Sequence, residues 1–352
     1  MKIVVAIDSF KGCLSSREAN QAAAEGIRRA CPDAVVVQVP VSDGGEGFLA
    51  AWHAAIGGEC VVVTVRDPLL RPVTARYLLH GRTAVIETAQ ACGLTLLTEE
   101  ERNPLVATSY GVGQLVADAV SRGADHVIVG LGGSATSDAG IGMLRALIDV
   151  FARHGQWDDV DVLRTVRFTI ASDVKNPLYG PNGAAHVFAP QKGATHSVVL
   201  QLDRRARTFA DVSARHLGYD RSGDAGAGAA GGLGYAFMQY LRAECQSGID
   251  LLLDAVRFTD IVSGADLVIT GEGTADSQTL MGKLPTGILR RAGSVPVSMI
   301  AGRVANGDEL LRAGFARVEC VNPAGLPLHE AMRKEVAQLN ISRTVCYLCT
   351  RT

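Results

Sequence analysis

The chain has 352 residues, 47% of them hydrophobic, and a formal net charge of −2 from 34 basic and 36 acidic residues. That length exceeds what a single hydrophobic core usually organises, so we expect two domains. The charges are mixed along the chain and the apolar runs are strand-sized, which argues against a nucleic-acid partner and against a membrane-spanning segment.

The first predicted element is a buried strand over Lys2–Ile7. Because this opening lacks the longer apolar core and the small-residue cleavage site of a signal peptide, we expect a cytoplasmic protein. Its eight cysteines are scattered, which is typical of reduced structural thiols. Cys346 and Cys349 stand close together but have no second pair or histidines at zinc spacing, so we expect no metal site there.

Strand-like and helix-like runs alternate along the rest of the chain. Ser16–Ala30 predicts a helix, and the spacing of Ser15 and Glu18 predicts a capping box at its start. The further expected strands are Ala34–Val39, Val61–Val65, Asp125–Gly130, Phe168–Ser172, Ala265–Thr270 and Pro296–Ala301. The further expected helices are Phe48–Ile56, Ser109–Arg122, Ile141–Arg153, Leu284–Ala292 and Glu309–Ala313. Short apolar strands between helices favour an α/β fold with parallel sheets that are covered on both faces.

One segment interrupts this alternation. Thr74–His80 and Thr83–Glu87 are separated by Gly81 and Arg82, a pattern that predicts a β-hairpin with a tight turn. A hairpin within a series of strands and helices suggests that a second domain begins near this point.

Glycine-rich, charged loops follow several of the expected strands. The 39 glycines gather there with Asp, Glu, Ser and Lys, and ligands of open parallel sheets bind at the carboxyl ends of strands. In the loop Asp8–Gly12, Asp8 suits a base or a metal ligand and Lys11 suits an anion, although Asp8 could equally cap a helix. In Ser42–Gly47, two carboxylates suit contacts to a metal or a hydroxyl group, or else the segment is a plain turn.

The loop Gly130–Gly140 is the most informative of these segments. Glycines let backbone N–H groups point inward, and small hydroxyl side chains add donors, which together suit a phosphate cradle at a helix start. Asp138 could then hold Mg²⁺. The loop also matches the dinucleotide fingerprint Gly-x-Gly-x-x-Ala, but the acidic residue required about 20 positions later corresponds to Asp149, which lies in a helical pattern.

Two further clusters carry similar chemistry. Ser172–Pro177 taken together with Pro190–Gly193 forms one, and Thr270–Lys283 forms the other; each cluster combines carboxylate, amide and lysine groups. A second fingerprint-like run, Gly226–Gly231, follows no strand and is expected to open a helix that packs closely or approaches a ligand. Gly282 and Lys283 are followed by Leu284, so the P-loop pattern is absent from the sequence.

These motifs resemble those of the bacterial type I glycerate kinases over nearly the whole chain. The stretches that carry the resemblance are Asp8–Gly12, Ser42–Gly47, Asp67–Leu69, Arg71–Val73, Gly130–Asp138, Ser172–Pro177, Pro190–Gly193, Gly226–Gly234 and Gly271–Lys283. The resemblance implies transfer of a phosphoryl group from ATP to D-glycerate with Mg²⁺, most often giving 2-phosphoglycerate and in some members 3-phosphoglycerate. It also implies a flavodoxin-like α/β domain with a parallel sheet, over residues 1–70 and 255–352, and an inserted α/β domain over 71–254 that carries the glycine-rich loop.

A set of expected site residues follows from the loops and the resemblance together. We expect Asp8 to take the hydroxyl proton, with Asp43 as second candidate, and Lys11 and Lys192 to offset negative charge. Asp138 or Glu272 is expected near Mg²⁺. The residues expected to bind the nucleotide are Gly132, Gly133, Ser134, Ala135, Thr136, Gly271, Glu272, Asp276, Gln278 and Lys283. The residues expected to bind the substrate are Ser9, Glu46, Arg71, Asp173 and Asn176.

The chain departs from the family pattern at several positions. The family usually has Arg where Thr274 stands, Gly where Leu70 stands, Asn where Ser137 stands and Thr where Phe48 stands. Thr274 has the largest consequence, because an arginine there could contact a phosphate group or the substrate carboxylate.

Other functions remain open at this point. The fingerprint match supports a nicotinamide-dependent oxidoreductase, and a sugar-acid-binding regulator that kept the fold is a third interpretation. The sequence leaves the phosphorylated carbon and the oligomeric state, monomer or homodimer, open.

Overall fold

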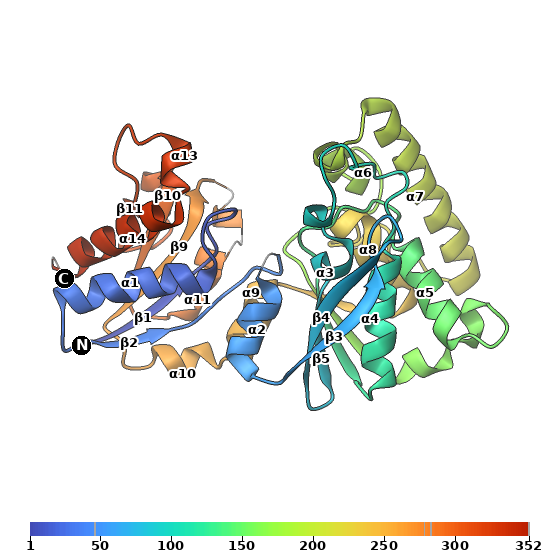
Figure 1. Ribbon diagram of the computed structural model, residues 1–352, viewed down its shortest axis with the longest axis horizontal. Helices are drawn as coiled ribbons and strands as arrows, with labels where there is room; N and C mark the ends of the chain where they lie inside the picture. Colours follow the sequence, from blue (N-terminus) through green and yellow to red (C-terminus); the bar gives the residue numbers. More distant parts are fainter. Residues whose placement is uncertain (46, 278, 282–283, 351–352) are drawn as a thin grey trace. The chain divides into compact units, whose positions relative to one another are not determined.

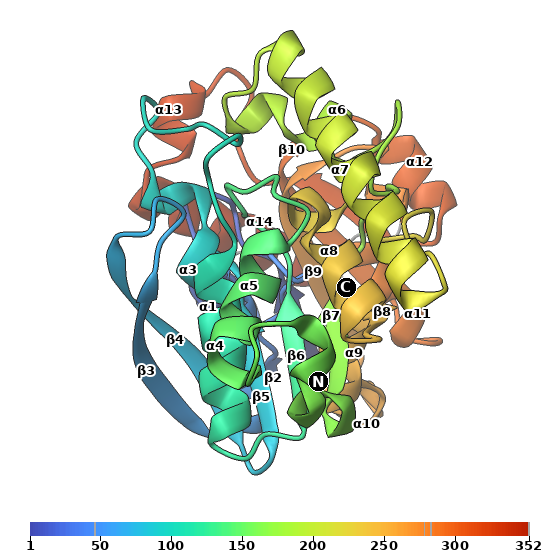
Figure 2. The ribbon, with the colours of Figure 1, turned by 90° about the vertical axis from the view of Figure 1, so that its right-hand side faces the viewer.

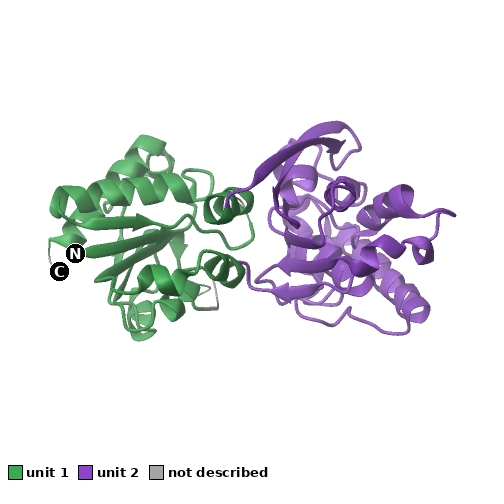
Figure 3. Ribbon diagram, turned by 90° about the horizontal axis from the view of Figure 1, so that it is seen from below, with its two compact units in different colours: residues 1–56, 249–352 green, residues 57–248 purple. Residues whose placement is uncertain are grey.

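The computed structural model describes residues 1–45, 47–277, 279–281 and 284–350 of the chain. These residues form two compact units, coloured separately in Figure 3. Unit 1 combines Met1–Ile56 with Ile249–Thr352, and unit 2 consists of Gly57–Gly248. The chain therefore leaves unit 1, completes unit 2 and returns, as expected for an inserted domain.

Unit 1 is built on a parallel sheet whose strand order is β11-β10-β9-β1-β2. Counted within this unit alone, the order is 2-1-3-4-5, which is the flavodoxin-like arrangement, and it reverses between β1 and β9. Ligands of such sheets bind at this point of reversal, beyond the carboxyl ends of the strands. The strands are β1 (Lys2–Ile7), β2 (Val35–Gln38), β9 (Leu267–Ala275), β10 (Val297–Val304) and β11 (Arg317–Cys320).

Helices α1 (Ser16–Ala30) and α14 (Lys334–Cys349) lie side by side on one face of this sheet (Figure 1). Alternate residues of β1, Ile3, Val5 and Ile7, belong to one buried apolar cluster with Ile27 of α1 and Ile341 of α14. The predicted capping box is confirmed, since Ser15 and Glu18 exchange both hydrogen bonds at the start of α1. The other helices of the unit are α2 (Phe48–Ile56), α9 (Gly248–Ala255), α10 (Phe258–Val262), α11 (Leu284–Arg291), α12 (Gly307–Arg312) and α13 (Leu328–Ala331).

Unit 2 is built on a mixed sheet of order β3-β4-β5-β6-β7-β8. Strands β3 to β5 are antiparallel, whereas β5 to β8 are parallel. Helices α4 and α5 pack side by side against this sheet (Figure 2), and α8 packs against β7 and β8. The strands are β3 (Glu59–Arg66), β4 (Pro72–His80), β5 (Thr83–Glu87), β6 (His126–Gly130), β7 (Arg167–Ala171) and β8 (Glu244–Gln246). The helices are α3 (Ala89–Cys92), α4 (Tyr110–Ser121), α5 (Ile141–Phe151), α6 (Ala184–Phe188), α7 (His196–Leu217) and α8 (Ala229–Tyr240).

The α/β class is confirmed, and the predicted hairpin is the pair β4 and β5. The units divide at 56/57 and 248/249, whereas the sequence placed the divisions at 70/71 and 254/255. The first difference arises because β3 pairs with β4 along its whole length, from Glu59 opposite Leu79 to Arg66 opposite Pro72. Hydrophobic periodicity shows that β3 is a strand but not which sheet it joins. Among the described residues, no helix combines the length and apolar character needed to cross a membrane.

The close approach of α1 and α14 depends on Gly26. A Cβ atom at this position would lie 2.3 Å from the carbonyl oxygen of Ser342. We expect Gly26→Ala to lower the free energy of unfolding by about 1–3 kcal/mol, because the helices must separate, even though alanine is the better helix former. Thermal or urea unfolding measures the change. Gly307→Ala is the control, because its Cβ would sit at an ordinary 3.5 Å from Val304; equal stability losses in both variants would contradict the role of close packing.

Candidate active site

Three carboxylates converge on one pocket of unit 1. Asp8 directly follows β1 and Glu272 lies on β9, and the register that pairs Ile7 with Gly271 brings them together where the strand order reverses. The backbone N–H of Asp8 donates to the carbonyl of Gly271 at 2.9 Å. Asp43 lines the same pocket, whose volume is about 390 Å³, and so do Ser9 and Lys11. The structure therefore joins the expected catalytic residues of the first two loops.

Helix α1 holds the strand ends that carry Asp8 and Asp43. The amide of Asn20 is fully buried; it accepts from the N–H of Ile7 at 2.9 Å and donates to the carbonyl of Val39 at 3.0 Å. One turn earlier, the Ser16 hydroxyl donates to the carbonyl of Ile7 and accepts from the N–H of Val41. Neither of these positioning residues was predicted from the sequence. Their spacing of four on one helix face, next to two strand ends, is the signal that could have shown them.

The pocket changes the proton affinity of Asp8. Burial, followed by the negative charge of Asp43, raises the pKa of the Asp8 carboxyl to about 8. The hydrogen bond from the backbone N–H of Ser9 and the charge of Lys11 oppose this rise only in part. A carboxyl group with this pKa exchanges its proton near neutral pH, which is what a general base requires.

Glu272 is nearly buried, and its Oε1 accepts from the hydroxyl of Thr279 at 2.6 Å. The expected loop after Thr270 is in fact the continuation of β9 as far as Ala275. Gly271 lies within that strand, where a Cβ atom would be 2.2 Å from the carbonyl oxygen of Ile300. This glycine therefore permits close strand pairing rather than forming a phosphate cradle. Asp276 follows the strand, and Glu46, Gln278 and Lys283 lie outside the described residues.

A second wall of the pocket was not predicted. It contains Arg303 of β10, Asn322, and the apolar side chains of Leu328 and Met332. The Asn322 amide donates to the carbonyl of Gly302 at 2.8 Å and accepts from Asn340 at 3.1 Å, so it is fixed by the protein. These residues come from the last 50 positions, where the sequence offered no glycine-rich loop to mark them.

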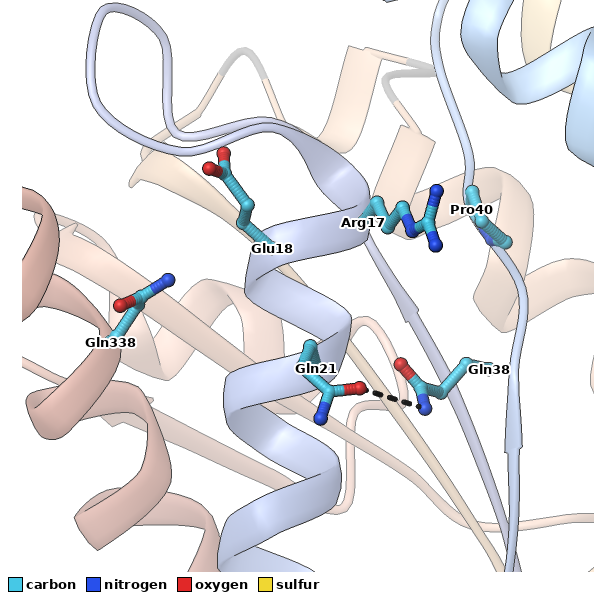
Figure 4. A pocket seen from close by; sticks show the side chains of 6 residues that line it. All are labelled: Arg17, Glu18, Gln21, Gln38, Pro40 and Gln338. Carbon is cyan, nitrogen blue, oxygen red and sulfur yellow. Dashed lines mark hydrogen bonds between the residues drawn. The ribbon is translucent and has the colours of Figure 1, made fainter.

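Another hollow of unit 1, shown in Figure 4, contains fewer side chains that could bind or activate a ligand. It lies along α1 and its single carboxylate, Glu18, is occupied by the capping box and by Lys334 at 3.0 Å. Gln21 and Gln38 face each other there through a hydrogen bond of 3.4 Å. The hollow has no second carboxylate or uncommitted lysine comparable with the pocket around Asp8.

In unit 2, the glycine-rich loop follows β6 and is anchored from beneath by Lys192. This lysine is buried, and its ammonium group donates to the hydroxyl of Ser134 at 3.0 Å and to the carbonyl of Thr136 at 2.6 Å. The N–H of Ala135 donates to the carbonyl of Cys92. Burial lowers the pKa of Lys192 to about 8, although nearby Asp138 opposes this change. Lys192 therefore stabilises the conformation of the loop, because its hydrogen bonds go to the loop residues Ser134 and Thr136.

The tip of this loop keeps donors available. Within the described part of the chain, the N–H groups of Gly132 and Gly133 make no hydrogen bond, and neither do the buried hydroxyl groups of Thr136 and Ser137. Gly231 and Gly232 pack against the far side of the loop, where Cβ atoms would meet Thr136 and Ala139. The close packing expected for residues 226–231 is thus present at the start of α8, where the backbone of Ala230, Gly231 and Gly232 is left-handed rather than helical.

Asp138, which the sequence placed near Mg²⁺, is instead surrounded by donors of its own unit. Its Oδ2 accepts from the backbone and the hydroxyl of Ser109 and from the N–H of Gly142, and its Oδ1 accepts from Gly140. These bonds tie the starts of α4 and α5 together. A carboxylate with this many hydrogen bonds is a structural cap rather than an open metal ligand. Within the described residues, no group of three or more His, Cys, Asp or Glu side chains is arranged to hold a metal ion.

The expected substrate residues of unit 2 are also engaged by the protein. All three guanidinium nitrogens of Arg71 donate hydrogen bonds: Nε to Asp67 and one terminal nitrogen to Glu101, both at 2.6 Å, and the other terminal nitrogen to the carbonyl of Leu96. Asn176 donates to the carbonyl of Asn182 at 2.8 Å. Asp173 lies in the loop that follows β7. Leu70, where the family pattern has glycine, has a φ of +62°, which explains why glycine suits this turn.

The oxidoreductase interpretation loses its support in this unit. Asp149, the residue at the place of the ribose-binding acid, lies in α5 and pairs with Arg145 at 2.9 Å and with Tyr110 at 2.9 Å. The fingerprint requires its acidic residue at the end of a strand.

Comparison with known proteins agrees with these features. The sequence model of the glycerate kinase family matches residues 3–349. A glycerate kinase of Bacillus subtilis is 42% identical over 94% of this chain and 93% of its own length, and the glycerate 2-kinase of Escherichia coli is 41% identical over 87% and 86%. The crystal structure of a Salmonella typhimurium LT2 protein assigned as glycerate kinase 2 superposes with a TM-score of 0.83 at 37% identity, covering 100% of this chain and 98% of that one.

The anchoring role of Lys192 can be tested by Lys192→Met. This change leaves the buried carbonyl of Thr136 without its donor, a loss of about 1–3 kcal/mol. We expect the amide of Ala135 to exchange its hydrogen about tenfold faster or more, as measured by mass spectrometry or NMR. Lys175→Met, at an exposed lysine of the same unit, is the control and should leave exchange unchanged. Unaltered exchange in Lys192→Met would contradict the anchoring role.

The raised pKa of Asp8 predicts a pH-dependent cost in stability. The folded state holds the proton more tightly than the unfolded state, so stability is lost as pH rises from about 4 through about 8. Asp8→Asn removes that cost while keeping an acceptor for Ser9. We expect its Tm to exceed that of the unaltered protein by about 2–4 °C at pH 9, with a much smaller difference at pH 5. Asp33→Asn is the exposed control, and a Tm difference for Asp8→Asn that is independent of pH would refute the prediction.

Proposed function

The chain belongs to the glycerate kinase family, and we propose that it transfers the γ-phosphoryl group of ATP to the 2-hydroxyl group of D-glycerate, giving 2-phosphoglycerate and ADP. The proposal rests mainly on the pocket of unit 1. The pKa of Asp8 is raised there, and Lys11, Asp43 and Glu272 line the same pocket. The position of the product phosphate is supported by the similarity to the glycerate 2-kinase of Escherichia coli.

Asp8 is the proposed general base. A phosphoryl acceptor must lose its hydroxyl proton as the new bond forms, and a carboxylate within reach of that hydroxyl accepts it. Asp8 is buried in the wall of the pocket, where burial and the charge of Asp43 increase its affinity for a proton. Lys11, which is exposed and lines the same pocket, offsets the negative charge of the substrates. Asp43 is the second candidate for the base.

The nucleotide phosphates suit the glycine-rich loop of unit 2. The N–H groups of Gly132 and Gly133 provide donors that turn toward an anion without a side chain in the way. Lys192 donates hydrogen bonds to Ser134 and Thr136, and in this way it stabilises the conformation of the loop rather than binding the phosphates itself.

Mg²⁺ is the remaining component of the proposal. It supplies neutralisation of phosphate charge, and it usually takes one or two carboxylates together with phosphate and water oxygens. Glu272 and Asp43 fit that requirement, because they place carboxylate oxygens at a pocket whose negative charge already raises the pKa of Asp8. Asp138 fits it poorly, because its Oδ2 accepts from Ser109 and Gly142 and its Oδ1 accepts from Gly140.

The direct test is ADP release with D-glycerate, ATP and Mg²⁺, with the product coupled through enolase in the absence of a mutase. ADP release with enolase coupling would support the 2-phosphate, and ADP release without coupling would indicate the 3-phosphate. Asp8→Asn should lower kcat by about a hundredfold or more, whereas Asp33→Asn should not change it. No ADP release from a folded preparation, or an undiminished kcat in Asp8→Asn, would contradict the corresponding part of the proposal.

A further inference from the structure

The pocket around Asp8 contains an arginine with no assigned role. Arg303 stands near the carboxyl end of β10 and lines the pocket together with Lys11, Asp8 and Glu272. Among the residues that the structure describes, its guanidinium group forms neither an ion pair nor a hydrogen bond. Most other arginines near carboxylates here are paired, for example Arg71, Arg290 and Arg291. An unpaired guanidinium on the wall of a small polar pocket is available to a ligand.

The neighbour of Arg303 in the sheet is Thr274. The two residues are register partners across the parallel pair of β9 and β10, so their side chains leave the same face of the sheet, and both line the pocket. The family pattern has arginine at 274, and a threonine cannot form the two parallel hydrogen bonds that a guanidinium makes to a carboxylate. Arg303 places a guanidinium on the same wall from the next strand.

The other residues that line the pocket indicate which kind of anion Arg303 would bind. Asp8, Asp43 and Glu272 supply acceptors for hydroxyl groups, and Leu328 and Met332 close one side with apolar surface. A ligand that satisfies both walls carries hydroxyl groups at one end and a carboxylate at the other, within a volume of about 390 Å³. A short hydroxy acid has this composition.

We propose that Arg303 binds the carboxylate group of the acid substrate and selects acids over the corresponding uncharged polyols. This inference rests on the proposed function for the identity of the acid. It places on β10 the guanidinium group that the family pattern has on β9. The guanidinium pairs with the carboxylate in two parallel hydrogen bonds, and the hydroxyl end of the acid is then directed toward Asp8.

The test is the dissociation constant of D-glycerate, measured by calorimetry without turnover, for the unaltered protein and for Arg303→Gln. We expect binding to weaken about 10- to 100-fold in Arg303→Gln, and the KM for D-glycerate to rise similarly while kcat and the KM for ATP change less than about threefold. The double variant Thr274→Arg with Arg303→Thr moves the guanidinium back to β9 and should recover most of the affinity. Arg312→Gln, at an exposed arginine of α12, is the control.

Glycerol serves as the uncharged probe. The preference for D-glycerate over glycerol, measured as the ratio of kcat/KM, should fall about 10-fold or more in Arg303→Gln, a change that loss of folding alone would not produce. Equal D-glycerate affinity in the unaltered protein and a folded Arg303→Gln would overturn the inference, as would absence of D-glycerate binding altogether. Weakened binding in Arg303→Gln without ADP release from the unaltered protein would support Arg303 and count against the proposed function alone.

Discussion

Burial of Asp8 beside two other carboxylates, at one point of a parallel sheet, sets the chemistry of the pocket in unit 1. Asp8 and Glu272 come together because the strand order reverses between β1 and β9, and Asp43 reaches the same pocket from the loop after β2. Removing such groups from water while they face each other favours the protonated acid. The negative charge of this pocket favours cationic groups, and two basic side chains, Lys11 and Arg303, line it. Helix α1 maintains this arrangement, since Asn20 and Ser16 hold the ends of β1 and β2 in place.

The glycine-rich loop of unit 2 is held in place by the protein, and we propose that its free backbone donors bind the phosphate groups of the nucleotide. The loop after β6 is fixed at its sides by Cys92 and at its base by the ammonium group of Lys192. Asp138 closes it by tying the starts of α4 and α5 together. A charge that is removed from water is costly unless it is hydrogen-bonded. The ammonium group of Lys192 donates to two oxygens of the loop, and the carboxylate of Asp138 accepts from Ser109, Gly140 and Gly142. Both groups therefore position the backbone, and we propose that Gly132 and Gly133 face the ligand.

Much of this organisation could be predicted from the sequence because it is local. Strand and helix periodicity, the capping box of Ser15 and the clustering of glycine with acids after strands all depend on residues within a few positions of each other. What could not be predicted depends on partners far away in the chain. Arg71 meets Glu101 across 30 positions, Lys192 meets Ser134 across 58, and Arg303 becomes a pocket residue only through its register with Thr274. A motif marks a residue type in a loop, but only packing determines whether its polar atoms face the protein or a ligand.

The central claim is that the pocket of unit 1 holds Asp8 as a carboxyl group that titrates near neutral pH. The most direct measurement is an NMR titration of the ¹³C-labelled aspartate carboxyl groups of the protein without ligands, with the Asp8 resonance identified by its loss in Asp8→Asn. The account predicts a pKa of about 8 for Asp8, and a lower value once Asp43→Asn removes the neighbouring charge. A pKa near the ordinary value of about 4 would contradict the account, because Asp8 would then be an unperturbed surface acid.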